Sequence, residues 1–147
     1  MRKQIYTIMT LFALVLTSCE SYLVNGDLDG FWQVKSIEDK QTGDITRCKG
    51  DIYYSFQRDL VLVSYVSPDI PIGQVKENHI AYFAHKDDSI FMTDFRIYID
   101  KEGTSSPLSK LEKFGLYDIY NTFQVEKLNK KSLILNSNKA RIILEKY

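Results

Sequence analysis

Few residues in this 147-residue chain have the types and spacing that chemistry requires. His79 and His85 lie six residues apart on one expected strand, so they face the same way about 20 Å apart. That separation prevents the two histidines from binding one metal ion together, although Asp94 on the next expected strand could approach either of them. Lone strand histidines are usually surface residues, so we predict no metal site and no cofactor.

The remaining reactive groups do not form a catalytic pattern. Cys48 lies between Arg47 and Lys49, which would favour a thiolate, yet no Cys–His pattern surrounds it, and we interpret it as a half-buried packing residue. Two neighbouring carboxylates at 87–88 fall in an expected hairpin turn, where such residues serve turn geometry. The sequence has no Gly-rich phosphate loop after a strand, no nucleophile elbow and no Cys-x-x-Cys motif. We therefore predict that the protein is not an enzyme.

Aromatic side chains are the larger resource, with ten tyrosines and eight phenylalanines. Inside a barrel they could shape a pocket for an apolar or carbohydrate-like ligand, or they could fill the interior completely. On the outside, exposed tyrosines would form a patch for a protein partner. The candidate ligand-binding residues are Tyr54, Phe56, Tyr82, Phe83 and Phe123.

The elements that must position these residues are short strands joined by tight turns. In Ile52–Gln57, for example, Ile52, Tyr54 and Phe56 fall on one face. The expected strands are 31–38, 52–57, 60–66, 79–85, 89–95 with an extended continuation, 122–128, 132–136 and 140–146. Consecutive hairpins of this number favour an all-β fold, an eight- or nine-stranded antiparallel up-and-down barrel, because closure removes edge strands. A two-sheet sandwich is the alternative.

One short helix interrupts the strands. Ser106 is a candidate N-cap, Pro107 fits the first helical position, and Gly115 stands where a C′ residue is expected. Leu108, Leu111 and Phe114 fall near one side. Because so short a helix is unstable alone in water, its apolar side must pack on the strands.

The N-terminus is typical of an export signal. Arg2 and Lys3 precede an apolar run that ends at Leu16, too short to cross a bilayer core of about 30 Å. The whole chain has equal numbers of basic and acidic residues, so without Arg2 and Lys3 its net charge is about −2. This slightly acidic charge argues against nucleic acid as a partner.

The four residues Leu16-Thr17-Ser18-Cys19 resemble the lipobox of bacterial lipoproteins. The resemblance implies that Cys19 becomes the first residue of the mature chain and that acyl chains on it anchor the protein to a membrane. It predicts a signal peptide at 1–18, a lipid-anchored polar leader at 19–28 and a barrel domain at 29–147. The alternative is ordinary signal cleavage after Ser18.

A second resemblance begins at Gly30-Phe31-Trp32, which is similar to the Gly-X-Trp signature of lipocalins. In that family the tryptophan plugs the closed end of the barrel, often under an arginine from the last strand, here Arg141. The layout resembles small lipocalin-like lipoproteins of Gram-negative bacteria, many of them in families without an assigned function. The resemblance thus implies a structural plug formed by Gly30, Trp32 and Arg141.

Together these resemblances predict an outer-membrane lipoprotein of the cell envelope, with its periplasmic or surface face left open. We expect it to bind a small hydrophobic ligand through a barrel mouth near the loop 67–73 and the helix 106–115. The alternative is a non-enzymatic interaction module, an accessory or inhibitor lipoprotein with a side-chain-filled barrel that contacts another envelope protein.

Overall fold

A computed structural model describes residues 23–67 and 77–147, so the predicted signal peptide, Cys19 and most of the loop 67–73 lie outside the described residues. The strands are β1 (Gly30–Asp39), β2 (Ile45–Arg47), β3 (Ile52–Gln57), β4 (Leu60–Tyr65), β5 (Glu77–Lys86), β6 (Ser89–Ile97), β7 (Asn121–Leu128), β8 (Ser132–Asn136) and β9 (Ala140–Lys146). The helical segments are η1 (Gly26–Leu28), α2 (Leu108–Leu111) and η2 (Glu112–Phe114).

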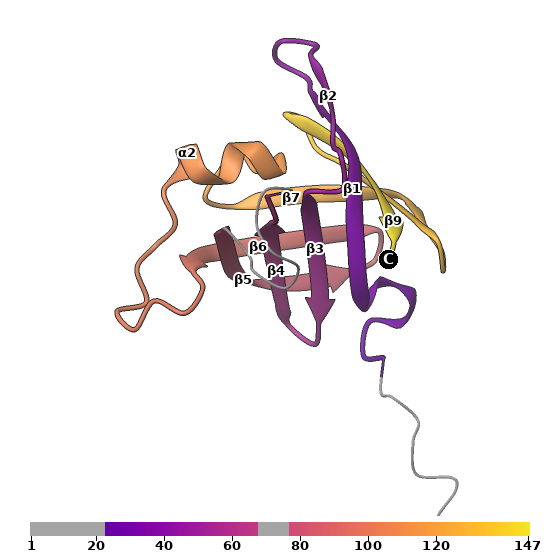
Figure 1. The fold of residues 1–147 in the computed structure, drawn as a ribbon. Coiled ribbons are helices and arrows are strands. Elements are labelled where there is room, and N and C mark those ends of the chain that lie inside the picture. Colours follow the sequence, from indigo (N-terminus) through magenta and orange to yellow (C-terminus); the bar gives the residue numbers. More distant parts are fainter. Residues whose placement is uncertain (1–22, 68–76) are drawn as a thin grey trace, which may run out of the picture.

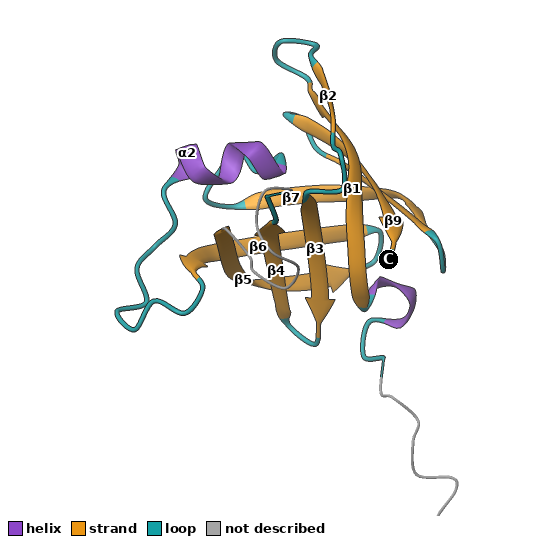
Figure 2. Ribbon diagram, viewed as in Figure 1, coloured by secondary structure: helices purple, strands orange, loops and turns teal. Residues whose placement is uncertain are grey.

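The strands form one antiparallel sheet that closes on itself. Its order is β2-β1-β3-β4-β5-β6-β7-β8-β9, and β9 pairs back with β1 from Trp32↔Lys146 to Asp39↔Ala140. Eight strands therefore make a closed barrel, and β2 extends one side of it as a short additional strand on β1 (Figures 1 and 2). The prediction of an all-β antiparallel barrel with one short helical segment is confirmed, and the sandwich alternative is wrong.

The alternation seen in the sequence becomes the inside and outside of the barrel. In β3, Ile52, Tyr54 and Phe56 are buried, and their neighbours are less so. The strand that the sequence did not predict is β2, whose three residues are all exposed and so carry no burial pattern. A strand is predicted from alternating apolar and polar residues, which reflect burial of one face. Because neither face of β2 is buried, its sequence has no such alternation.

Aromatic rings pack against one another in the interior. The ring centroids of Tyr54 and Phe56 are 6.1 Å apart, and those of Phe56 and Phe83 are 5.1 Å apart. Phe123 is 1% exposed. By contrast, Tyr82 is 55% exposed because it has the opposite parity to Phe83 on β5, so its assignment to an inner ligand-binding set is wrong.

The closed end of the barrel lies at the turns β3–β4, β5–β6 and β7–β8. There the Trp32 indole is fully buried, and its Nε1 donates a hydrogen bond to the carbonyl of Leu28 at 2.7 Å. Leu28 is itself buried, so the described end of the predicted leader packs onto the barrel. Trp32 is therefore buried at the end of the barrel where the plug was expected.

The cation over the tryptophan is Lys146 rather than Arg141. The Nζ of Lys146 is 4.4 Å from the Trp32 ring centroid. Arg141 lies between the inward-facing residues Ala140 and Ile142, so it points outward, where its Nε donates to Glu126 at 2.9 Å. The expected role of Arg141 is therefore wrong, because strand parity turns its side chain away from the interior.

In the ranges 23–67 and 77–147, the structure contains no helix that is long and apolar enough to cross a membrane.

Candidate binding site at the mouth of the barrel

The opposite end, the mouth, is covered by a cap segment, residues 108–114, which comprises α2 and η2 (Figure 2). Leu111 and Phe114 are buried, whereas Leu108, expected on the same side, is 38% exposed. The carbonyl of Phe114 accepts a 2.6 Å hydrogen bond from the Tyr54 hydroxyl inside the barrel. The segment ends at Gly115, whose φ of +81° is left-handed. A Cβ at Gly115 would lie 2.9 Å from Ile142 Cδ1, so glycine also allows the close approach of the cap to β9.

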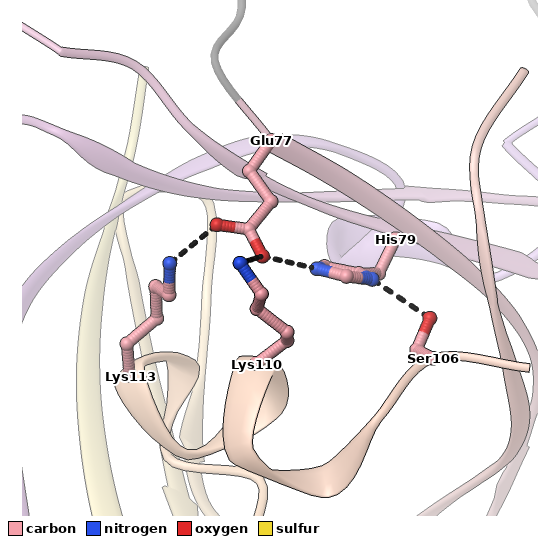
Figure 3. A network of polar contacts seen from close by, with 5 residues as sticks. All are labelled: Glu77, His79, Ser106, Lys110 and Lys113. Carbon is pink, nitrogen blue, oxygen red and sulfur yellow. Dashed lines mark hydrogen bonds and ion pairs between the residues drawn. The ribbon is translucent and has the colours of Figure 1, made fainter.

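A polar network holds the cap segment to the start of β5 (Figure 3). The Glu77 carboxylate accepts from His79 Nε2 at 3.1 Å, pairs with Lys110 at 3.8 Å, and accepts a hydrogen bond from Lys113. His79 Nδ1 is 2.7 Å from the Ser106 hydroxyl. Partial burial by itself would raise the pKa of Glu77, but the hydrogen bonds from Lys113 and His79 and the two lysine charges outweigh it and lower that pKa.

Beside the cap segment lies a hollow of about 460 Å³, which we call the mouth groove. Its apolar and aromatic side is formed by Ile37, Ile52, Tyr65 and Tyr117. The two isoleucines are nearly buried, at 5% and 6% exposure, and the tyrosines are half-buried. The groove is therefore an outward extension of the core, at the end of the barrel where a ligand would enter.

The rim of the mouth groove is charged. Two threonines, Thr42 and Thr46, line it on the β1–β2 side. The charged lining residues are Asp39, Asp44, Asp51, Glu112 and Lys113. Burial raises the pKa of the Tyr117 phenol, and the charge of Asp39, a hydrogen bond with Asp39 and the charge of Glu112 raise it further. The rim is thus predominantly acidic around an apolar floor.

Comparison with known proteins identifies the family. The lipocalin-like domain family matches residues 14–147. The chain belongs to this family. A lipocalin-like protein from Bacteroides uniformis covers 83% of this chain and 100% of its own at 22% identity, with a TM-score of 0.60. An uncharacterized protein from Bacteroides eggerthii covers 82% of this chain and 99% of its own at 26% identity, with a TM-score of 0.62. No curated protein matches the sequence.

In this lipocalin-like domain, four of the five predicted aromatic residues lie inside and one outside. Tyr54, Phe56, Phe83 and Phe123 share the interior, but they contact neighbouring side chains and none of them lines the mouth groove. The groove instead uses Tyr65 and Tyr117, which the sequence interpretation did not select. Little in the sequence indicated either residue. Tyr65 ends β4 and Tyr117 lies in the loop before β7, so neither belongs to an alternating pattern.

His79 is the other residue that the lipocalin-like domain places differently. It is 2% exposed, and its ring packs edge-on against Phe114 at 5.7 Å, so the prediction of a surface histidine is wrong. Ser106 is not an N-cap, since α2 begins at Leu108 without a side-chain cap and the Ser106 hydroxyl contacts His79. Within the described residues no group of three or more His, Cys, Asp or Glu side chains could hold a metal ion.

The order Ser106–His79–Glu77 in the lipocalin-like domain is that of a nucleophile, a base and an acid. Two contacts favour a structural role instead. The Ser106 backbone N–H already donates to the carbonyl of Phe95 at 2.8 Å, so it is not directed at a substrate. The Glu77 carboxylate is shared with Lys110 and Lys113, which hold the cap segment.

Cys48, the remaining reactive group, is partly buried, as predicted. Burial, and to a smaller extent the charge of Asp51, raises the pKa of its thiol to about 11.

Proposed function

We propose that this lipocalin-like domain binds a small, largely hydrophobic molecule in the mouth groove and does so without catalysis. The supporting observation is the hollow of about 460 Å³ at the end of the closed barrel, with Ile37, Ile52 and two tyrosines on one side. Small-molecule sites typically combine such an apolar wall with a few polar groups that fix orientation. Here the two threonines and the carboxylates of the rim supply those polar groups.

The groove is favoured over the barrel interior as the ligand site because large buried side chains pack in the interior. Trp32, Tyr54 and Phe56 are at most 1% exposed, and Phe114 closes the mouth above them with no exposed surface. A ligand in the interior would have to displace Phe114 and break the hydrogen bond between its carbonyl and Tyr54. Binding in the groove requires neither change.

We further propose that the protein acts at the cell envelope, attached through acyl chains on Cys19. The described residues begin at residue 23, four residues after this cysteine, and η1 packs at the closed end of the barrel. The mouth groove lies at the opposite end, where the β1–β2 hairpin and the cap segment both line it. A tether at the closed end would leave the groove accessible to ligand.

Binding of a neutral hydrophobic dye tests the ligand site. Tyr117→Ala should weaken Nile red binding to the mature protein by about fivefold or more, because it removes part of the groove wall. The matched control is Tyr82→Ala, which removes a tyrosine from the outer face of β5. Native mass spectrometry of the same two variants should show a copurified apolar molecule lost only from Tyr117→Ala. Equal binding by all three proteins would refute the groove as the site.

A second candidate is the interaction module, and the outer face of three neighbouring strands favours it. Leu60 on β4 is paired with Tyr82 on β5, and Ala84 on β5 is paired with Phe91 on β6. Leu60, Tyr82 and Phe91 are 37%, 55% and 43% exposed. Apolar side chains gathered on adjacent strands are typical of a protein contact. Loss of a crosslinked envelope protein in Tyr82→Ala, with dye binding intact, would favour this function.

A further inference from the structure

We infer that the mouth groove selects ligands that combine an apolar body with a positively charged group, an alkylammonium or a guanidinium. This inference rests on the proposed function, because it names the class of ligand for the same groove. The balance of charge around the hollow favours such a ligand. Four carboxylates line it, and the single lysine among the lining residues, Lys113, pairs with Glu77.

The four carboxylates come from three separate parts of the chain. Asp39 and Asp44 flank the β1–β2 turn, Asp51 precedes β3, and Glu112 begins η2. Asp39 and Asp51 already accept backbone hydrogen bonds in their own turns. Asp44 and Glu112 are exposed at the rim on opposite sides, one on the hairpin and one on the cap segment. An anionic ligand would be repelled from both sides, whereas a cationic head would be attracted from both.

The wall of the groove suits the same ligand. The ammonium of Lys113 lies 5.2 Å from the centroid of the Tyr65 ring, so the protein already places a cation against this aromatic wall. Ile37 and Ile52 offer buried apolar contact beneath the rim. A chain or ring carrying a positive group can therefore place its apolar part on the isoleucines and its charge among the carboxylates.

The acidic rim also acts on neighbouring groups. The charges of Asp39 and Glu112 add to burial in raising the pKa of Tyr117, and the charge of Asp51 adds to burial in raising that of Cys48. The negative charges of the rim thus disfavour the anionic forms of both side chains. This agrees with the charge count.

A bare metal ion fits the groove less well than an organic cation. In residues 23–67 and 77–147, no three His, Cys, Asp or Glu side chains come close enough to hold one ion. Carboxylates that are distributed around a hollow of about 460 Å³ instead suit a cation with an apolar body large enough to fill it.

Three probes of one chain length separate charge from hydrophobicity. Isothermal titration of the mature protein with n-octylammonium, 1-octanol and octanoate should show octylammonium binding about tenfold or more tightly than either of the others. The difference should shrink as salt is added, because the rim is exposed to solvent. Calcium ions should not displace octylammonium.

Paired variants locate the effect. Asp44→Asn combined with Glu112→Gln should abolish the preference by weakening octylammonium binding to the level of 1-octanol. The control, Asp88→Asn with Glu102→Gln, removes one aspartate and one glutamate charge from other turns and should keep the preference. Circular dichroism of both double variants verifies that they fold.

The outcomes distinguish the two proposals. Equal binding of octylammonium and 1-octanol would overturn the charge selectivity and leave the ligand site standing. Binding of none of the three probes would overturn both. A preference that survives Asp44→Asn with Glu112→Gln, or stoichiometric displacement by calcium, would also overturn this inference.

Discussion

At the residue scale, Lys146 on the last strand contacts the segment that leads into the first strand, at the closed end of the barrel. Its ammonium lies over the Trp32 ring and donates hydrogen bonds to the carbonyls of Asp27 and Asp29. Burial lowers the pKa of Lys146 and outweighs the opposing charges of those two aspartates. Gly30 makes room for it, since a Cβ there would lie 2.9 Å from Lys146 Cε. The backbone also favours glycine at this position, because the φ of Gly30 is +123°, a conformation that residues with a side chain rarely adopt.

Lys146→Met tests this arrangement. The variant loses a cation–π contact and two hydrogen bonds, so we expect a loss of about 1–2 kcal/mol in the free energy of unfolding. Because Trp32 is the only tryptophan, its fluorescence reports the site directly, and its emission should change in this variant. Arg141→Met, on the same strand but facing outward, should leave the emission as it is. A comparable change in both variants would contradict the assignment.

At the element scale, the cap segment depends on contacts from outside itself. It contains only seven residues in its two helical turns, and a helix this short does not persist alone in water. Leu111 and Phe114 bury its apolar side, and Glu77 holds its two lysines. Glu77 therefore fixes the polar side of the cap segment, as Phe114 fixes its apolar side. The charge state of Glu77 should affect the stability of this contact.

The lowered pKa of Glu77 gives this effect a direction in pH. The stabilisation is fully present above the ordinary glutamate pKa of about 4.3 and is lost as the pH falls through the lower value of the folded state. Glu77→Gln should cost about 1–2 kcal/mol near pH 7 and less as the pH falls. Urea unfolding at several pH values measures this difference. Lys113→Met should reduce the pH dependence too, whereas Lys127→Met, on β7, should not.

At the scale of the whole molecule, closure of the sheet separates two ends with different surroundings. Pairing of β1 with β9 leaves β2 as the short strand outside the ring. One end packs η1 and Lys146 around Trp32, and the other carries the cap segment and the mouth groove. If the chain is tethered near residue 19, the first end faces the tether and the second faces the surroundings.

Cys19→Ala tests the tether in the whole protein. Expressed with its own N-terminus in a Gram-negative host, the unaltered protein should fractionate with membranes and incorporate radiolabelled palmitate. The variant should lose the label and leave the membrane fraction, because three acyl chains anchor stably and none remains. Cys48→Ala is the matched control and should behave as the unaltered protein does. A Cys19→Ala protein that keeps its label would exclude the lipobox interpretation.

The sequence by itself determined eight of the nine strands, because these depend on local signals, and it favoured a barrel over a sandwich. Alternating burial in β3, β8 and β9 places Tyr54, Leu133 and Ile142 inside, and Gly30-Phe31-Trp32 marks the first strand. Only tertiary structure decided which distant residues meet. Glu77, His79 and Ser106 come together because the loop after β6 returns over β5, and the mouth groove joins residues as far apart as Ile37 and Tyr117. The physical reason is that strand alternation is a property of neighbours in the chain, whereas the site depends on how the closed barrel brings its loops to one end.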